Sequence, residues 1–194
     1  RKGLAMIGRK PKATRGRGSF DPLLDAPAPA IEDCTEWIEP DGLGGFASGT
    51  ATGINTRRYH ALLLVSRRPP TERFVLVNSV EAWLEIKGGA ARSGATYPLS
   101  SQRYAPGVTH PQGWASLSTF RTDPWPVWIY SPTPDVRVRH ERVVRHGEPT
   151  VLLTWSLLDP IQNATLFVRP LISGRDYHAL HHANASFRFD ADVW

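Results

Sequence analysis

The segment EWIEPDGLGGFASGTATGINTRRYHALLLVS, at Glu36–Ser66, decides how this chain is organised. It starts with an apolar stretch at Trp37, and the five glycines between positions 42 and 53 predict a loop with little side-chain bulk. Residues 55–60 then place six hydrogen-bonding side chains directly before the apolar run 61–65, which predicts a buried strand. A loop that leads polar side chains into a rigid strand is a common way to build a binding site.

Two parts of the sequence resemble the N-terminal domain of bacterial and archaeal glycogen debranching enzymes, the amylo-α-1,6-glucosidase family. The first part runs from the EW at position 36 to the HALL that ends at Leu63, and the second is VRPLISGRDYH at Val168–His178. The weaker elements PG at 106–107 and PWPVW at 124–128 lie between them in the expected order. The resemblance extends over residues 34–194.

This resemblance implies a large, supersandwich-like β-sandwich of the kind that accompanies a helical barrel. It implies that the whole enzyme hydrolyses the α-1,6-glucosidic branch points of glycogen, with or without an associated 4-α-glucanotransferase activity. The catalytic acids of the family lie in a later (α/α)-barrel domain, and this chain ends at Trp194, before any such domain. We therefore expect no catalytic residue here, a sandwich that is incomplete at its C-terminal end, and a chain that is inactive alone.

The residue pattern independently predicts a mainly β fold. Seventeen prolines and sixteen glycines argue against a helical bundle, and short β-like runs separated by turns are typical of an antiparallel β-sandwich. The expected strands are 59–66, 74–77, 83–86, 127–130, 136–141, 151–158, 164–169 and 186–189, with a strand beginning at Phe120. We expect residues 97–119 to be turn-rich and polar, and residues 176–184 to form one short helix.

The charge is distributed unevenly along the chain. Residues 1–18 carry seven Lys or Arg and no acidic residue, whereas the rest is close to neutral. We expect residues 1–33 to be a basic, Pro-rich tail and linker with little regular structure, and residues 34–194 to be the sandwich domain. A solvated tail is the simpler interpretation, and contact with nucleic acid is the alternative.

The cysteine content, the apolar runs and the N-terminus indicate the cellular location of the protein. Cys34 is the single cysteine, so an internal disulfide is excluded, which suits a reducing cytoplasm. No apolar run reaches transmembrane length and the N-terminus lacks the apolar core of a signal peptide, so we expect a cytoplasmic protein without a membrane partner. Arg1 is not a start methionine, and we expect a fragment or a processed product.

The polar run before the first buried strand is the main candidate for a substrate-binding or domain-interface site. Amides and hydroxyls match ring hydroxyls, guanidinium groups donate several hydrogen bonds, and aromatic rings cover apolar sugar faces. If the run is a strand, alternate residues face opposite sides, so at most half reach one ligand. The alternative is that these residues hold the loop and a domain interface together. The candidates are Asn55, Thr56, Arg57, Arg58, Tyr59 and His60.

The second signature segment supplies four further candidates. Asp176 is expected either to pair with its neighbour Arg175 or to cap a helix that begins there, and the alternative is a surface that contacts the catalytic domain. The candidates are Arg175, Asp176, Tyr177 and His178.

Three other patterns carry less weight. The sequence GLGGFA at 42–47 fits a dinucleotide fingerprint formally, but neither a preceding strand nor a following helix is expected, so we reject it. His178, His181 and His182 share a helix face without further ligands nearby, so no metal and no cofactor are expected. Among the tryptophans, Trp83 and Trp155 are expected in the core, and those in or beside Pro-rich loops are better candidates for stacking on glucose: Trp114, Trp125 and Trp128.

These observations together predict the N-terminal glucan-binding or scaffolding domain of a glycogen debranching enzyme. Its partners would be an α-glucan, either glycogen or a branched dextrin, and the C-terminal catalytic domain of the same enzyme. Two alternatives remain open. One is a free-standing carbohydrate-binding module, and the other is a nucleic-acid-binding protein that uses the basic tail.

Overall fold

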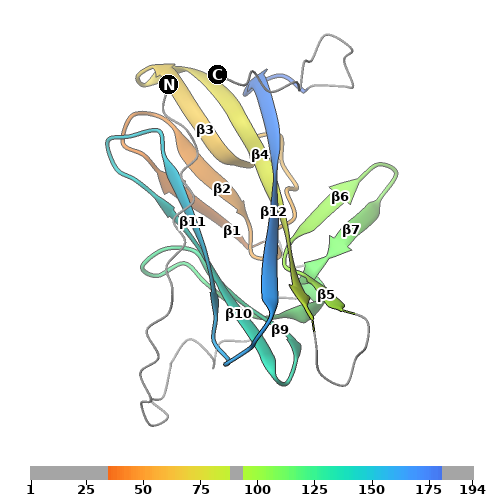
Figure 1. Ribbon diagram of the computed structural model, residues 1–194. Coiled ribbons are helices and arrows are strands. Elements are labelled where there is room, and N and C mark those ends of the chain that lie inside the picture. Colours follow the sequence, from red (N-terminus) through yellow and green to blue (C-terminus); the bar gives the residue numbers. More distant parts are fainter. Residues whose placement is uncertain (1–34, 88–93, 181–194) are drawn as a thin grey trace, which may run out of the picture.

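Two antiparallel sheets face each other across one apolar core in the computed structural model, which describes residues 35–87 and 94–180 (Figure 1). The larger sheet has the order β1-β2-β3-β4-β12, with β5 also paired to β4. The smaller sheet has the order β11-β10-β9-β8, and β6 and β7 form a separate hairpin. The predicted antiparallel β-sandwich is therefore confirmed.

The bounds of the elements are as follows. The larger sheet contains β1 (Glu36–Pro40), β2 (Phe46–Thr50), β3 (Ala61–Arg68), β4 (Thr71–Ile86), β5 (Ala95–Pro98) and β12 (Ala164–Asp176). The hairpin consists of β6 (Ser101–Tyr104) and β7 (Val108–Gln112), and the short 3₁₀ helix η1 (Gly113–Ser116) follows it. The smaller sheet contains β8 (Leu117–Arg121), β9 (Val127–Thr133), β10 (Val136–Val144) and β11 (Val151–Leu157).

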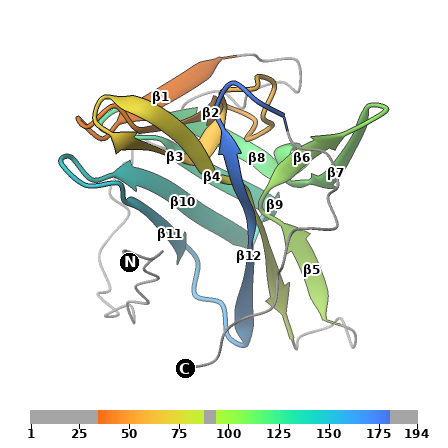
Figure 2. The same ribbon diagram turned by 90° about the horizontal axis from the view of Figure 1, so that it is seen from above.

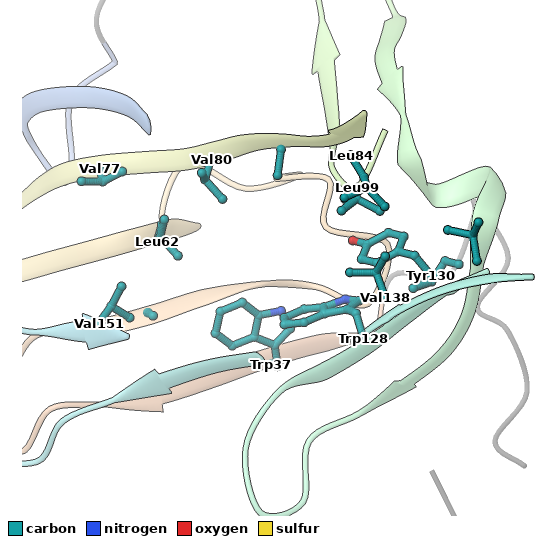
Figure 3. Packing of buried hydrophobic residues seen from close by; sticks show 14 residues of the cluster. Trp37, Leu62, Val77, Val80, Leu84, Leu99, Trp128, Tyr130, Val138 and Val151 are labelled. Atoms are coloured by element: carbon teal, nitrogen blue, oxygen red, sulfur yellow. The ribbon is translucent and has the colours of Figure 1, made fainter. Parts of the chain in front are cut away.

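The core lies between the sheets and is built around two tryptophans. Figure 3 shows side chains from both sheets pointing into the space between them, with Trp37 and Trp128 side by side. The two rings meet edge to face with centroids 5.6 Å apart, and Trp128 Nε1 donates to the carbonyl of Ala51 (2.7 Å). Trp128 is fully buried. Its predicted role as a sugar platform is therefore wrong, because it lies in β9 rather than in the preceding Pro-rich loop.

Two buried polar residues of β10 complete this core. The strand alternates as predicted, but His140 and Arg142 join its buried face. The Arg142 guanidinium lies 4.6 Å from the Trp128 ring centroid and donates through Nε to His140 Nε2 (3.1 Å). His140 Nδ1 must then carry the ring proton and donate it to the carbonyl of Thr154 (2.9 Å). Burial lowers the pKa of His140 well below its usual value, so the ring is neutral.

Several predicted element boundaries need correction. Residues 46–50 are not loop but strand β2, which pairs with β1 so that Gly49 lies opposite Trp37. The expected strands at 74–77 and 83–86 are parts of one continuous strand, β4. The turn-rich region 97–119 contains the β6–β7 hairpin and η1.

The C-terminal predictions are settled only in part. The expected strand at 164–169 extends to Asp176, which ends β12, so the predicted helix does not begin at that residue. The rest of that helix, the strand at 186–189 and the basic tail lie outside the described residues.

The turn between β1 and β2, which we call the glycine turn (residues 41–45), is a tightly packed structural element. Asp41 Oδ1 accepts hydrogen bonds from the backbone N–H of Leu43 (2.7 Å) and of Gly45 (2.9 Å). A Cβ on Gly45 would lie 2.4 Å from Asp41 Oδ2 and 2.6 Å from the carbonyl oxygen of Leu64. The Asp41 carbonyl also accepts a hydrogen bond from Gly147 N in the β10–β11 turn (2.7 Å). The turn thus joins the two sheets. A strand, β1, does precede it, contrary to expectation, but strand β2 and not a helix follows it, so the dinucleotide fingerprint lacks the helix that it needs.

Candidate functional site

The two signature segments meet at a cleft of about 370 Å³ on the outer face of the larger sheet, which we call the signature cleft. Val80 and Ala82 of β4 face the core, so the residues that alternate with them along the strand, Ser79 and Glu81, face away from it. The cleft is lined by Asn55, Thr56, Arg57, Arg58, His60, Asn78, Ser79, Gln102, Leu171, Ser173, Arg175 and Leu180.

The polar loop (residues 55–60) is a turn and not a strand. His60 N donates to the carbonyl of Arg57 (3.1 Å), and the buried His60 ring accepts the N–H groups of Thr56 (3.1 Å) and Arg57 (3.3 Å) at Nδ1. The strand alternation on which the limit of half of these residues per ligand rested is therefore wrong. Five of the six side chains line one cleft, and Tyr59 lies outside its lining.

Glu36 completes this loop and was missed as a site residue. Its carboxylate pairs with Arg57 and also accepts from His60 Nε2 (3.2 Å). Because His60 Nδ1 is an acceptor, the ring proton must be on Nε2. The hydrogen bond from Arg57 lowers the pKa of Glu36, and burial lowers the pKa of His60, so a neutral imidazole holds the loop. The contact depends on β1 lying beside the loop, which no local sequence signal indicates.

Arg175 joins the two signature segments. It is 6% exposed, and its guanidinium donates to the carbonyls of Arg58 (2.6 Å), Ala179 (2.9 Å) and Tyr177 (3.3 Å). Arg58 in turn donates to the carbonyl of His178 (2.8 Å). This reciprocal pair binds segments that are more than one hundred residues apart in sequence. Arg175 therefore positions backbone, and Arg58 keeps exposed donors beside the cleft.

Tyr59, Tyr177 and His178 form an aromatic cluster at the edge of the site. The Tyr59 ring lies 5.4 Å from that of Tyr177 and 5.8 Å from that of His178, and the Tyr59 hydroxyl is 3.2 Å from His178 Nδ1. Tyr59 is 41% exposed. The rings of Tyr177 and His178 also border a neighbouring depression of about 430 Å³, together with Arg73 and Asp176.

Asp176 interacts electrostatically with its neighbour Arg175, as one predicted role has it, and also forms local backbone hydrogen bonds. Its Oδ1 accepts from the backbone N–H of His178 (2.8 Å), and its carbonyl accepts from Ala179 N (3.1 Å). These bonds form a turn at the end of β12 and cap no helix among the residues described up to position 180. Asp176 therefore shapes the aromatic cluster without lining the signature cleft.

The signature cleft presents both donors and acceptors. Asn55 Nδ2 donates to the carbonyl of Asn78 (2.9 Å), and Gln102 Nε2 donates to Ser79 Oγ (2.8 Å). Within the described part of the chain, the oxygens of the Asn55 and Gln102 side chains and the Ser173 hydroxyl have no hydrogen-bond partner. These donors and acceptors are complementary to those of a ligand that has many hydroxyl groups.

The tryptophans are distributed differently from the prediction. Trp125 is half-buried and donates to Glu141 (3.0 Å) on the smaller sheet, and none of the six tryptophans in the described ranges lines the signature cleft. Trp155 packs against the core and stacks on His140 with centroids 4.4 Å apart, as predicted. Trp83, expected in the core, lies instead on the outer face of β4.

Two features of the described residues bear on metal binding and membrane insertion. In the ranges 35–87 and 94–180, no group of three or more His, Cys, Asp or Glu could hold a metal ion. His181 and His182, from the predicted histidine face, lie beyond these ranges. In the same ranges, no helix is long and apolar enough to span a membrane.

Comparison with protein families matches residues 35–193 to the family described as glycogen debranching enzyme N terminal. A search of curated proteins and a search of solved structures find no match.

Proposed function

The chain belongs to the family of glycogen debranching enzyme N-terminal domains, and we propose that it serves such an enzyme as a glucan-binding and scaffolding domain. The whole enzyme would hydrolyse the α-1,6-glucosidic branch points of glycogen or branched dextrin, with its catalytic acids in a separate (α/α)-barrel domain. The family match supports a domain boundary near residue 34.

We also propose that the protein is cytoplasmic, because its single cysteine suits a reducing compartment.

The observation that carries this proposal is the meeting of both signature segments at one cleft. Arg175 donates to the Arg58 carbonyl and Arg58 donates to the His178 carbonyl, so the fold fixes the two segments relative to each other. Preorganised polar groups lower the entropy cost of binding a ligand. The volume of the cleft, about 370 Å³, lies within the range of small-molecule sites.

The chemistry of the cleft suits a neutral sugar. Each sugar hydroxyl donates and accepts, and the cleft offers guanidinium donors at Arg57 and Arg58 together with amide and hydroxyl oxygens. Tyr59 beside the loop provides an exposed aromatic ring of the kind that covers the apolar face of a sugar.

The scaffolding part of the proposal is supported by exposed apolar side chains near the same cleft. Ile172 of β12 is 68% exposed, and Leu180, which lines the cleft, is 59% exposed. Apolar groups next to a polar cleft are typical of surfaces that pack against another domain. The following catalytic domain is the partner that we propose for them.

Native gel electrophoresis in the presence of glycogen tests the proposal. We expect glycogen to retard the 194-residue chain, and we expect Arg57→Ala to reduce the affinity about fivefold, since a charged donor to sugar hydroxyls is lost. Arg103→Ala is the matched control, because Arg103 is exposed on β6 and does not line the cleft. Unretarded migration of the unaltered chain would contradict glucan binding.

A second assay separates binding from catalysis. The chain alone should release no glucose from branched dextrin, because the proposed catalytic acids belong to another domain. Measurable glucose release by the purified chain would show that this division of labour is wrong.

A further inference from the structure

A second cleft, of about 460 Å³, lies on the same outer face of the larger sheet, where the β6–β7 hairpin projects from it beside β5 (Figure 2). We call it the hairpin cleft. Its floor includes Glu81 and Trp83 of β4 and Arg169 of β12, and its wall on the hairpin includes His110, Pro111 and Gln112. None of these residues belongs to the predicted site.

One residue of the floor, Trp83, belongs to an aromatic pair that lies outside the core. Ala82 and Leu84 point into the core, so Trp83 between them points outward, opposite Phe167 of β12. The two rings are stacked with an interplanar angle of 6° and centroids 5.3 Å apart, and Phe167 is 38% exposed. Two large aromatic side chains on an outer sheet face are a common feature of a ligand-binding surface.

Beside the aromatic pair lies an ion pair that is fixed by hydrogen bonds. Glu81 is only 3% exposed, accepts from Arg169 Nε (2.7 Å) and pairs also with Arg169 Nη2. The Tyr104 hydroxyl donates to the other oxygen of Glu81 (3.0 Å). The carboxylate and the guanidinium neutralise each other, so this part of the floor favours a neutral polar ligand over an anion.

We propose that the hairpin cleft is a second α-glucan subsite. The Trp83 ring covers the apolar face of a glucosyl residue, and Arg169, His110 and Gln112 bind its hydroxyl groups. An apolar cleft with an aromatic ring and a few fixed polar groups has the composition that sugar recognition needs. The proposal deepens the proposed function and rests on it.

The two clefts adjoin along the strands. The antiparallel pair Ser79 and Leu171 lines the signature cleft, and the next outward-facing pair, Glu81 and Arg169, lines the hairpin cleft. Residues two apart on a strand are separated by about 7 Å. One glucan chain can therefore engage both clefts, and a longer maltooligosaccharide should bind more tightly than a short one.

Isothermal titration calorimetry of the 194-residue chain with maltoheptaose and with maltose tests the subsite. We expect Trp83→Leu, which keeps an apolar side chain at the site, to weaken maltoheptaose binding about tenfold, since ring stacking is lost. A His110→Ala/Gln112→Ala double variant should weaken it about threefold. Val108→Ala on the same hairpin is the matched control, because Val108 is 56% exposed and does not line the cleft.

The outcomes separate this proposal from the proposed function. Unaltered maltoheptaose affinity in both the Trp83→Leu and the hairpin double variant, with Arg57→Ala still weakened, would overturn the second subsite alone. Absence of any binding by the unaltered chain would reject glucan binding as a whole. If circular dichroism shows that Trp83→Leu is unfolded, the hairpin double variant decides, because its two side chains are exposed.

Discussion

The glycine turn (residues 41–45) and the polar loop (residues 55–60) belong to one signature segment, yet the structure uses them in opposite ways. The glycine turn is packed against its surroundings: a Cβ on Gly44 would lie 2.7 Å from the carbonyl oxygen of Pro70, and Asp41 is buried. The polar loop is open to solvent at Arg57, Arg58 and Tyr59 and is held by side-chain hydrogen bonds.

This difference shows that glycines in a signature do not by themselves indicate a flexible binding loop. In the glycine turn they are required because a Cβ would collide with the His146 ring at Gly42, with Pro70 backbone at Gly44, and with the Leu64 carbonyl at Gly45. The side chains that can meet a ligand come later, where the chain leaves the packed turn and is held by Glu36, His60 and Arg175.

The largest expected effect is on the packed turn. Gly45→Ala places a Cβ against Asp41 Oδ2 and the Leu64 carbonyl, neither of which can retreat, so we expect a loss of roughly 3 kcal/mol of unfolding free energy. Gly53→Ala is the control, because nothing lies within 4 Å of its Cβ and only its positive φ of 78° opposes the change, at about 1 kcal/mol. Equal urea midpoints for the two variants would contradict this ranking.

The next effect links the two signature segments. Arg175→Lys keeps the charge but cannot reach the three carbonyls that the guanidinium joins, so we expect a loss of roughly 2 kcal/mol of unfolding free energy. Glycogen affinity should fall as well, since the polar loop loses its connection to the second segment. Arg103→Lys serves as the control in urea denaturation and in glycogen gels. Wild-type behaviour of Arg175→Lys in both measurements would show that the two segments hold their positions independently.

A smaller effect concerns pH. The folded pKa values of His140 and His60 lie below the usual value of 6.5, chiefly because of burial. When the pH is lowered, these histidines therefore bind protons at a higher pH in the unfolded chain than in the folded chain. The unfolding free energy should therefore decrease as the pH falls through 6.5 towards the folded pKa values.

Urea denaturation at several pH values checks the sign. His140→Gln should flatten the pH profile more than His60→Gln, because His140 is the more deeply buried and its pKa is lowered further. A profile that rises on acidification through pH 6.5 would show that the sign is wrong.

The smallest effect on stability is expected in the polar loop itself. Arg57 pairs with Glu36 at the surface, and exposed ion pairs contribute little to stability. Arg57→Ala should leave the urea midpoint unchanged while glycogen binding weakens. A clear decrease in the midpoint would mean that Arg57 holds the fold, as the glycine turn does, and would remove the contrast between the two regions.

The sheet pattern could be predicted where neighbouring side chains decide it. Alternating side chains at Val136–Val144 and the apolar run before Arg67 are local signals, and the sequence correctly predicted strands there, which are β10 and β3. β2 was missed because Gly49 and its small neighbours have low strand propensity. They form a strand because β1 pairs alongside and the Trp37 ring lies against Gly49, which is a tertiary effect.

The sequence could predict most residues of the candidate site, but it could not predict how they are arranged in space. Five of the six residues of the polar loop line one cleft together with Arg175. The other four candidates do not: Tyr59, Asp176, Tyr177 and His178. Glu36 was not predicted beside the polar loop, and Trp83 was wrongly placed in the core, for the same physical reason: local sequence does not say which strand lies next to a loop, or which face of a continuous strand is covered.

β4 passes both clefts without interruption, and its pairing with β12 advances one residue at a time from Ser79–Leu171 to Ile86–Ala164. Inserting or deleting a single residue there would exchange the inward and outward sets of side chains, turning Trp83 into the core and Ala82 towards solvent. Related sequences should therefore vary in the identity of residues 79–86 but not in their number. A constant number of residues between positions 79 and 86 would then identify the relatives that retain both clefts, whatever single side chains they carry.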